Sequence, residues 1–182
     1  MNLYEIRLSE NISDIENFLD AFFFDCQCAL FLVDMTNPKS FKPVEKILTN
    51  IKKNNNNYSN LKKIIVENKI DDKYDANNKT IRNFENFFNN IDSLKISIKT
   101  GENFEDLLNE INAAINPDSY ESNKNLPINQ ITKRTFKPNF NTNGSISLIL
   151  VGDSEVGKSN FMTRYTKNEF SLNYIATLGE VK

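Results

Sequence analysis

Hydrophobic residues in this chain follow two different periods, which alternate along most of its length. Continuous or alternating apolar runs predict strands at residues 4–6, 28–34, 61–66, 94–98 and 146–151. Apolar residues spaced three and four apart predict helices at residues 12–23, 44–51, 81–88 and 104–115. Strands that alternate with helices of this length predict an α/β fold built on a mostly parallel sheet.

Residues 117–144 follow neither period. Pro117 ends the last helix predicted before this stretch, and the chain that follows is rich in Asn, Ser, Lys and Pro with only scattered apolar residues. The pattern predicts a linker at residues 117–144, between an upstream segment of residues 1–116 and a downstream segment of residues 145–182. The two segments together have the length of one small domain.

The composition narrows the possible chemistry. The net charge is −2 and both signs are mixed along the chain, so no basic stripe indicates a nucleic-acid partner. The chain contains no histidine, which excludes Ser–His and Cys–His catalysis and removes the commonest zinc ligand. Cys26 and Cys28 lie beside an apolar run, and we interpret them as buried, reduced thiols, which favours a reducing compartment.

The same features predict a soluble, cytoplasmic protein. The longest apolar run, residues 28–33, is too short to cross a bilayer, and no signal peptide precedes it. The sequence ends in Glu180-Val181-Lys182, without a cysteine for prenylation. We therefore expect no integral membrane segment and no prenyl anchor.

Residues 152–159 carry the most specific motif of the chain. They read Gly152-Asp153-Ser154-Glu155-Val156-Gly157-Lys158-Ser159 and fit Gly-x-x-x-x-Gly-Lys-[Ser/Thr], the phosphate-binding loop. In this motif the glycines let backbone N–H groups turn towards phosphate oxygens, the lysine adds a positive charge, and the serine hydroxyl ligates Mg²⁺. A predicted strand before the loop and an apolar-faced helix after it place the loop at the positive end of a helix. This context predicts a phosphate site.

Two motifs in the upstream segment resemble those of a known family. Residues 68–71 read Asn-Lys-Ile-Asp after a buried strand, and residues 97–99 read Ser-Ile-Lys at the end of the next strand. Together with the phosphate loop and the stretch at residues 168–179, they resemble the motifs of Ras-superfamily small GTPases, the Rab family in particular. The resemblance implies the three-layer P-loop NTPase fold, with GTP or GDP and Mg²⁺ as ligands.

The resemblance also implies which residues would contact these ligands. Asp71 would accept hydrogen bonds from guanine, Asn68 would brace the loop, and Lys69 would lie over the base. Thr177 stands where the family's switch-I threonine joins the phosphate-loop serine, here Ser159, in binding Mg²⁺. The full set of guanine-binding positions implied in this way is Asn68, Lys69, Asp71, Ser97, Ile98 and Lys99.

The order of these motifs is reversed relative to the family. Residues 1–116 resemble the third strand through the last helix, residues 145–182 resemble the first strand through switch I, and the family's second, edge strand has no counterpart. Three arrangements fit this order: a circular permutant that closes on itself, a window on a tandem array, and halves that pair between chains. A coil of about 25–28 residues spans the gap between the segments, so we expect closure within one chain.

The hydrolysis motif is degenerate. By the family's spacing, Leu8-Ser9-Glu10-Asn11-Ile12 replaces Asp-x-x-Gly-Gln, which holds the magnesium-bound water, senses the γ-phosphate and orients the attacking water. Leu8 and Ile12 have no polar atoms for these tasks, and Glu10 is a substitute carboxylate by position alone. Two functions remain: guanine-nucleotide binding with weak or absent hydrolysis, and a nucleotide-free pseudo-GTPase that serves as a structural or protein-interaction module. Protein partners are expected in either case, but the sequence does not identify them.

Overall fold

The computed structural model describes residues 2–8, 22, 23, 26–53, 58, 60–115 and 147–171. The helix predicted at residues 12–23 therefore lies outside the described residues, except for Phe22 and Phe23. The predicted linker at residues 117–144, the stretch from Ser9 to Ile12, and Thr177 lie outside them altogether.

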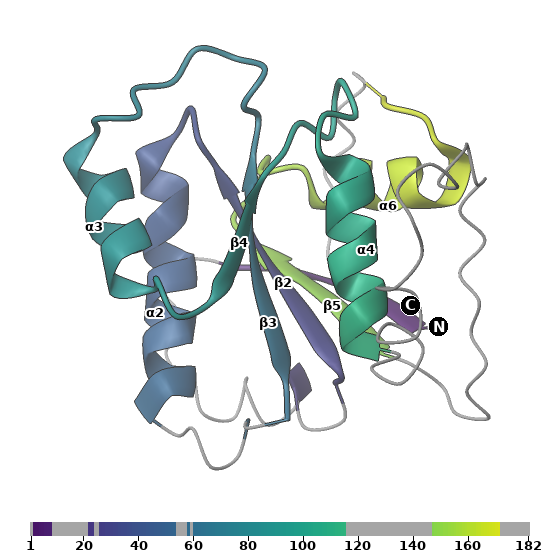
Figure 1. Ribbon diagram of the computed structural model, residues 1–182, viewed down its shortest axis with the longest axis horizontal. Coiled ribbons are helices and arrows are strands. Elements are labelled where there is room, and N and C mark those ends of the chain that lie inside the picture. The colour runs from purple at the N-terminus through teal and green to yellow at the C-terminus, as the bar shows by residue number, and fades with distance from the viewer. Residues whose placement is uncertain are drawn as a thin grey trace, which may run out of the picture.

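A five-stranded parallel sheet forms the centre of the molecule (Figure 1). Its strands, in the spatial order β1-β5-β2-β3-β4, are β1 (Asn2–Arg7), β2 (Cys28–Asp34), β3 (Lys62–Asn68), β4 (Asp92–Lys95) and β5 (Ser147–Gly152). The inner strands β2 and β5 have mainly apolar sequences, and β3 has an apolar centre at residues 64–66, because helices cover both faces of the sheet. The α/β class predicted from the hydrophobic pattern is confirmed.

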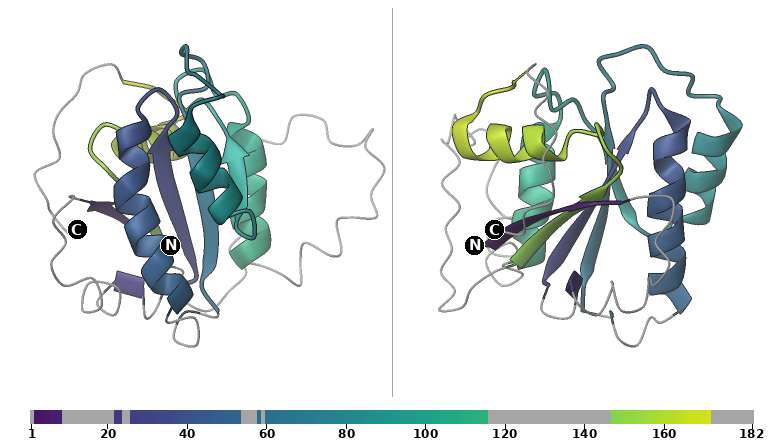
Figure 2. Two further views of the ribbon diagram at one scale, coloured as in Figure 1. Left: turned by 90° about the vertical axis from the view of Figure 1, so that its left-hand side faces the viewer. Right: turned by 180° about the vertical axis from the view of Figure 1, so that it is seen from behind.

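Helices form a layer on each side of the sheet (Figures 1 and 2). In the described residues they are α2 (Phe41–Lys53), α3 (Lys79–Phe87), α4 (Phe104–Ile115) and α6 (Lys158–Lys167), and the short 3-10 turn η1 (Pro38–Ser40) precedes α2. Helices α2 and α3 cover one face, and α4 and α6 cover the other. The arrangement is the three-layer fold that the family resemblance implied.

Neighbouring residues of β2 belong to opposite hydrophobic cores. Phe31 packs with residues of α2 and α3, whereas Leu32 packs with residues of α4 and α6. Because side chains alternate along a strand, a strand between two helical layers is apolar at successive positions. In the second core, the rings of Phe104 on α4 and Phe161 on α6 lie 5.4 Å apart between centroids. This contact joins the upstream segment to the downstream segment.

Strand β5 places the downstream segment in the middle of the sheet. It lies between β1 and β2, and both Tyr4 and Ala29 are in register with Ile149. The two segments therefore close on each other within one chain, as the length of the linker suggested. In the described part of the chain no strand pairs with the outer edge of β1.

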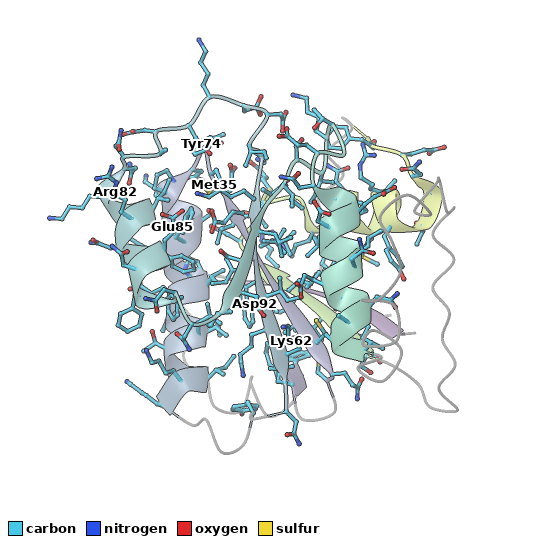
Figure 3. The ribbon with its side chains drawn as sticks, in the orientation of Figure 1. Met35, Lys62, Tyr74, Arg82, Glu85 and Asp92 are labelled. Carbon is cyan, nitrogen blue, oxygen red and sulfur yellow. The ribbon has the colours of Figure 1, made fainter. Side chains whose placement is uncertain are left out.

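Strand β4 begins and ends earlier than its alternating pattern predicted, at Asp92 and Lys95 in place of residues 94 and 98. The strand ends at Lys95, although Ile96 is buried and its N–H donates to the Glu67 carbonyl over 2.9 Å. Ile96 and Ile98 lie beyond the strand but are buried in the core, so core packing and not strand geometry accounts for this part of the apolar pattern. At the other end of β4, the Lys62 ammonium of β3 donates to the Asp92 carboxylate (Figure 3). This ion pair links the two strands at the edge of the sheet.

Phe87 departs from the sequence pattern, whereas the two cysteines follow it. Phe87, predicted to lie on the apolar face of α3, is 51% exposed, because the helix ends there and Phe88 takes the buried position beyond it. Cys26 and Cys28 are buried free thiols, as predicted, and burial raises the pKa of each to about 12. They belong to different cores, since Cys26 precedes β2 and does not lie within it.

Candidate functional site

The loop between β5 and α6 wraps so tightly that its two glycines leave no room for side chains. A Cβ at Gly152 would lie 2.6 Å from the Leu32 carbonyl oxygen, and one at Gly157 would lie 2.5 Å from Asn68 Nδ2. Gly157 also has a φ of +110°, which residues with a side chain rarely adopt. Glu155, the acidic residue within the motif, is exposed. The two glycines of the motif are therefore required by the close approach of β2 and β3.

Lys158 begins α6, and its ammonium is folded back over the loop. Its Nζ donates to the carbonyls of Gly152 (3.0 Å) and Asp153 (2.6 Å). Burial lowers the pKa of Lys158 to about 8, and the carboxylates of Glu5 and Asp153 oppose that effect. At neutral pH the ammonium remains charged, so the loop holds a buried cation next to a helix N-terminus.

The hydroxyl of Ser159 contacts a carboxylate of β1. Ser159 Oγ lies 3.1 Å from Glu5 Oε1 and 3.0 Å from Glu5 Oε2, and donates to this carboxylate. Sequence reasoning missed Glu5. The available signal was weak: a single acid between Tyr4 and Ile6 in a short alternating run, which places it on the opposite face of the strand from buried Ile6.

Asn68, at the end of β3, connects the phosphate loop to a loop of the upstream segment. Its side chain is buried, its Nδ2 donates to the Val156 carbonyl over 2.8 Å, and its Oδ1 accepts from the Ile98 N–H over 3.0 Å. The resemblance implied a bracing role for Asn68, and its side chain contacts both loops. The Ile98 N–H, expected at the edge of the base, instead donates to Asn68 Oδ1, so the Asn68 amide has a donor partner for its oxygen and an acceptor partner for its nitrogen.

Asp71 lies beside the residues of the Ser-Ile-Lys motif. The Ser97 hydroxyl donates to Asp71 Oδ1 over 2.6 Å, and the Lys99 ammonium lies 3.1 Å from Asp71 Oδ2. Burial alone would raise the pKa of Asp71, but the hydrogen bonds from Ser97 and Lys99 outweigh it and hold this pKa below its ordinary value. Asp71 is therefore an ionised hydrogen-bond acceptor at neutral pH.

Lys69 makes an ion pair with the end of β2. Its Nζ lies 2.7 Å from Asp34 Oδ2, and Asp34 Oδ1 accepts hydrogen bonds from the backbone N–H (2.9 Å) and the hydroxyl (2.7 Å) of Thr36. Lys69 has a φ of +69°, so the chain turns sharply between β3 and Asp71. The ion pair fixes the position of the Lys69 ammonium at the carboxyl ends of two neighbouring strands.

Arg164 of α6, the helix that follows the phosphate loop, binds the upstream loop that carries Ile98 and Lys99. Its Nε donates to the Ile98 carbonyl, and its Nη2 donates to the Lys99 carbonyl over 2.7 Å. Gly101 lies in the same loop, and its φ of +87° is one that residues with a side chain rarely adopt. Sequence reasoning also missed Arg164, because a single arginine on a helix carries no signal of its target.

The position predicted for the magnesium-side aspartate holds a hydrocarbon. Leu8 follows β1, its N–H donates to the Gly152 carbonyl over 2.9 Å, and its side chain is fully buried in the core beneath α2 and α3. Leu8 is therefore next to the phosphate loop, as the family's spacing placed it, but offers no ligand atom. Thr177 and Glu10 lie outside the described residues.

The comparisons with known proteins identify the family. The Ras family model matches residues 13–117 and 147–182, which is most of the chain. The chain therefore belongs to the Ras family. The curated matches are Rab-related. RABA1a of Arabidopsis thaliana is 59% identical over 32 residues, covering 18% of this chain and 15% of the relative. Rab-11B of Dictyostelium discoideum is 53% identical over 32 residues, covering 18% and 14%.

These matches span a small part of each relative. YPTC6 of Chlamydomonas reinhardtii is 46% identical over 43 residues, which cover 24% of this chain and 20% of the relative. Among solved structures, YjeQ from Thermotoga maritima is 20% identical with a TM-score of 0.48, covering 80% of this chain and 40% of that chain.

None of the helices in the described ranges is long and apolar enough to span a membrane.

Proposed function

We propose that this protein binds GDP or GTP with Mg²⁺ in a site that its upstream and downstream segments form together. The observation that carries the proposal is the side chain of Asn68, which bonds to the Val156 carbonyl of the phosphate loop and to the Ile98 N–H. A side chain that bridges both loops fixes the spacing between a phosphate site and a base site. Residues 1–116 and 145–182 would then be two parts of one nucleotide-binding domain, joined by the linker at residues 117–144.

At the phosphate end, three groups would bind the anion. These are the N–H groups of the loop at residues 152–159, the Lys158 ammonium, and the N-terminus of α6. A phosphate oxygen would replace the carbonyls that Lys158 now contacts, and its charge would offset the burial that lowers the pKa of this lysine. Ser159 and Thr177 would ligate Mg²⁺, which neutralises charge on the bound phosphates.

At the base end, Asp71 would select guanine. Its ionised carboxylate would accept from the N1–H and the exocyclic amine of guanine, a pair of donors that adenine does not present. Ser97 orients that carboxylate. The Ile98 N–H would be shared between Asn68 and the guanine carbonyl as a three-centre hydrogen bond. Lys69, held by Asp34, would cover the face of the base.

The remaining guanine-site residue, Lys99, would move when the nucleotide binds. Its ammonium pairs with Asp71 and lies 3.5 Å from Asp72 Oδ1. Guanine donors would take its place on Asp71, while Asp72 would keep the ammonium near the loop. This exchange leaves no charge without a partner in either state.

Hydrolysis would be weak or absent. Leu8 is buried and has no polar atom, so it cannot hold a magnesium-bound water in the way the family's aspartate does. We expect a turnover no faster than the intrinsic rate of small GTPases, on the order of 10⁻⁴ s⁻¹. Single-turnover measurement of phosphate release from GTP tests this rate, and a markedly faster value would mean that another residue replaces the missing groups.

A nucleotide-free pseudo-GTPase is the second candidate. The observation that favours it is that the charged groups of the site already have partners within the protein. Lys158 donates to carbonyls of its own loop, and Asp71 accepts from Ser97 and pairs with Lys99. A fold with no need for a nucleotide would serve as a structural or protein-interaction module. The two candidates predict the same fold and differ only in ligand binding.

Titration with fluorescent GDP in the presence of Mg²⁺ separates the two candidates. Nucleotide binding predicts saturation that Lys158→Ala abolishes and that Lys167→Ala, an exposed lysine at the far end of α6, preserves. Asp71→Asn should shift the preference towards xanthine nucleotides, because an amide can donate to the extra carbonyl of xanthine. The neighbouring exchange Asp72→Asn should leave base selectivity unchanged. If no binding is seen at high micromolar nucleotide, the pseudo-GTPase is the only one of the two candidate functions that remains.

A further inference from the structure

Strand β1 brings a carboxylate to the hydroxyl that the proposed function assigns to Mg²⁺. Both oxygens of Glu5 lie within 3.1 Å of Ser159 Oγ. The phosphate loop, its lysine and its serine are therefore accompanied by an acid from a different part of the chain.

The register of the sheet explains why Glu5 reaches this place. Glu5 is paired with Leu150 of β5, whose side chain lies in the core formed by α4 and α6. Ile6 and Leu8 are buried in the opposite core. Since side chains alternate along a strand, Glu5 faces the layer in which α6 begins, and Ser159 is the second residue of that helix.

Glu5 and Ser159 form a donor pair that suits Mg²⁺. This ion is usually held by one or two carboxylates together with substrate phosphates, and seldom by a cage made only of protein side chains. A hydroxyl and a carboxylate beside a phosphate loop supply the protein's share of such a site.

The alternative explanation for Glu5 is repulsion. A carboxylate near bound phosphates weakens binding unless a cation lies between them. Mg²⁺ would convert this repulsion into attraction, so the two explanations predict opposite dependences on the metal. Leu8, at the position where the family has its magnesium-side acid, contributes no charge.

We infer that Glu5 is the magnesium-side carboxylate of this protein, three residues before the position at which the family places it. Glu5 would bind Mg²⁺ together with Ser159 and the nucleotide phosphates, and would thereby make nucleotide binding depend on the metal despite the loss of an acid at Leu8. This inference rests on the proposed function, because Mg²⁺ would be held partly by the nucleotide.

The test compares fluorescent-GDP dissociation constants in Mg²⁺ and in EDTA. We expect removal of Mg²⁺ to weaken binding by wild type about 5–150-fold, the usual range of coupling between two ligands. Glu5→Gln should reduce that ratio to nearly 1, with binding in EDTA equal to or tighter than wild type, because the repulsion is gone. Glu5→Asp keeps the charge and should retain part of the ratio. Glu45→Gln, an exposed acid on α2, is the charge-matched control and should behave as wild type.

Electron paramagnetic resonance of Mn²⁺ gives a readout that is independent of nucleotide fluorescence. With saturating GDP, Glu5→Gln should lower the affinity for Mn²⁺ about 10–100-fold relative to wild type and to Glu45→Gln. Thermal unfolding of each variant confirms that it is folded. A fold defect in Glu5→Gln would leave Glu5→Asp to carry the comparison, with a partial loss of Mn²⁺ affinity expected.

Each other outcome has a distinct meaning. If wild type binds no nucleotide, the proposed function fails and the inference fails with it. If wild type binds with a strong Mg²⁺ dependence that Glu5→Gln retains, only the inference is overturned. It is also overturned if Glu5→Gln tightens binding equally with and without Mg²⁺, which is the result of repulsion alone, or if Glu10→Gln removes the dependence instead.

Discussion

Replacing Phe161 by alanine tests whether the downstream segment is part of the same core as the upstream segment. Phe161 on α6 is fully buried. Its ring centroid lies 5.4 Å from that of Phe104, the first residue of α4, and 6.1 Å from that of Tyr165. In a closed domain these contacts belong to the central packing of the protein. In two separated halves, the side chain would lose its partner on α4.

The expected loss of stability is large. Truncation of a buried phenylalanine costs about 3–5 kcal/mol, a range that includes the cavity left behind. Small domains have unfolding free energies of about 5–15 kcal/mol, so the variant would lose a large part of its total. With an m-value of about 2 kcal/mol per molar urea, a loss of about 4 kcal/mol moves the unfolding midpoint down by about 2 M.

Urea unfolding followed by circular dichroism measures this shift. The matched control is Phe87→Ala, since Phe87 is 51% exposed and contacts Phe88 and the ammonium of Lys52 at one end of α3. Its loss should cost less than about 1 kcal/mol. If Phe161→Ala costs no more than Phe87→Ala while both variants keep the wild-type m-value, the closed core is refuted.

Three other tests concern buried groups. Burial raises the pKa of Glu67 above its ordinary value of 4.5, so this carboxyl contributes stability below pH 4.5 that is lost as the pH rises through the raised pKa. The urea stability of Glu67→Gln relative to wild type should therefore increase from pH 4.5 to neutral pH, and a flat difference would contradict this. Cys26 and Cys28, whose pKa values burial raises to about 12, should react with a disulfide reagent only after unfolding; rapid labelling of the native protein would show otherwise. Gly157→Ala places a Cβ 2.5 Å from Asn68 Nδ2 at a φ of +110°, and should lower stability by about 1–3 kcal/mol in thermal unfolding.

The sequence pattern predicted best those strands and helices whose burial does not depend on which element packs next to them. The apolar runs of β2 and β5 indicated inner strands, because such strands are buried whichever neighbours they have. The apolar spacing in α2 and α4 likewise located both helices to within a few residues. Ends were less predictable. Phe87 and Phe88 are chemically identical in the sequence, and only the end of α3 decides which of them is buried.

The residues of the candidate site also fall into two groups, those that lie in local sequence motifs and those that only the fold brings to the site. The phosphate loop and the Asn68 and Asp71 loops are contiguous motifs, so the sequence located them directly. Glu5 and Arg164 act across the sheet and across two segments, and their partners are set by register and packing. No local pattern distinguishes them from solvated charges. For Ile98 the motif predicted the position of the residue in the sequence, but not that its N–H donates to Asn68.

The place of β5 has a consequence for how the chain acquires its fold. The strand that separates β1 from β2 pairs Leu148 with Cys28, which the ribosome makes 120 positions earlier. At synthesis rates of about 5–20 residues per second, β2 waits for its inner neighbour for about 6–24 s. Throughout this interval both nascent edges carry unpaired peptide groups, a state that favours adhesion to other chains. A protein built in this order is expected to depend on chaperones during translation more than one whose central strand is synthesised first.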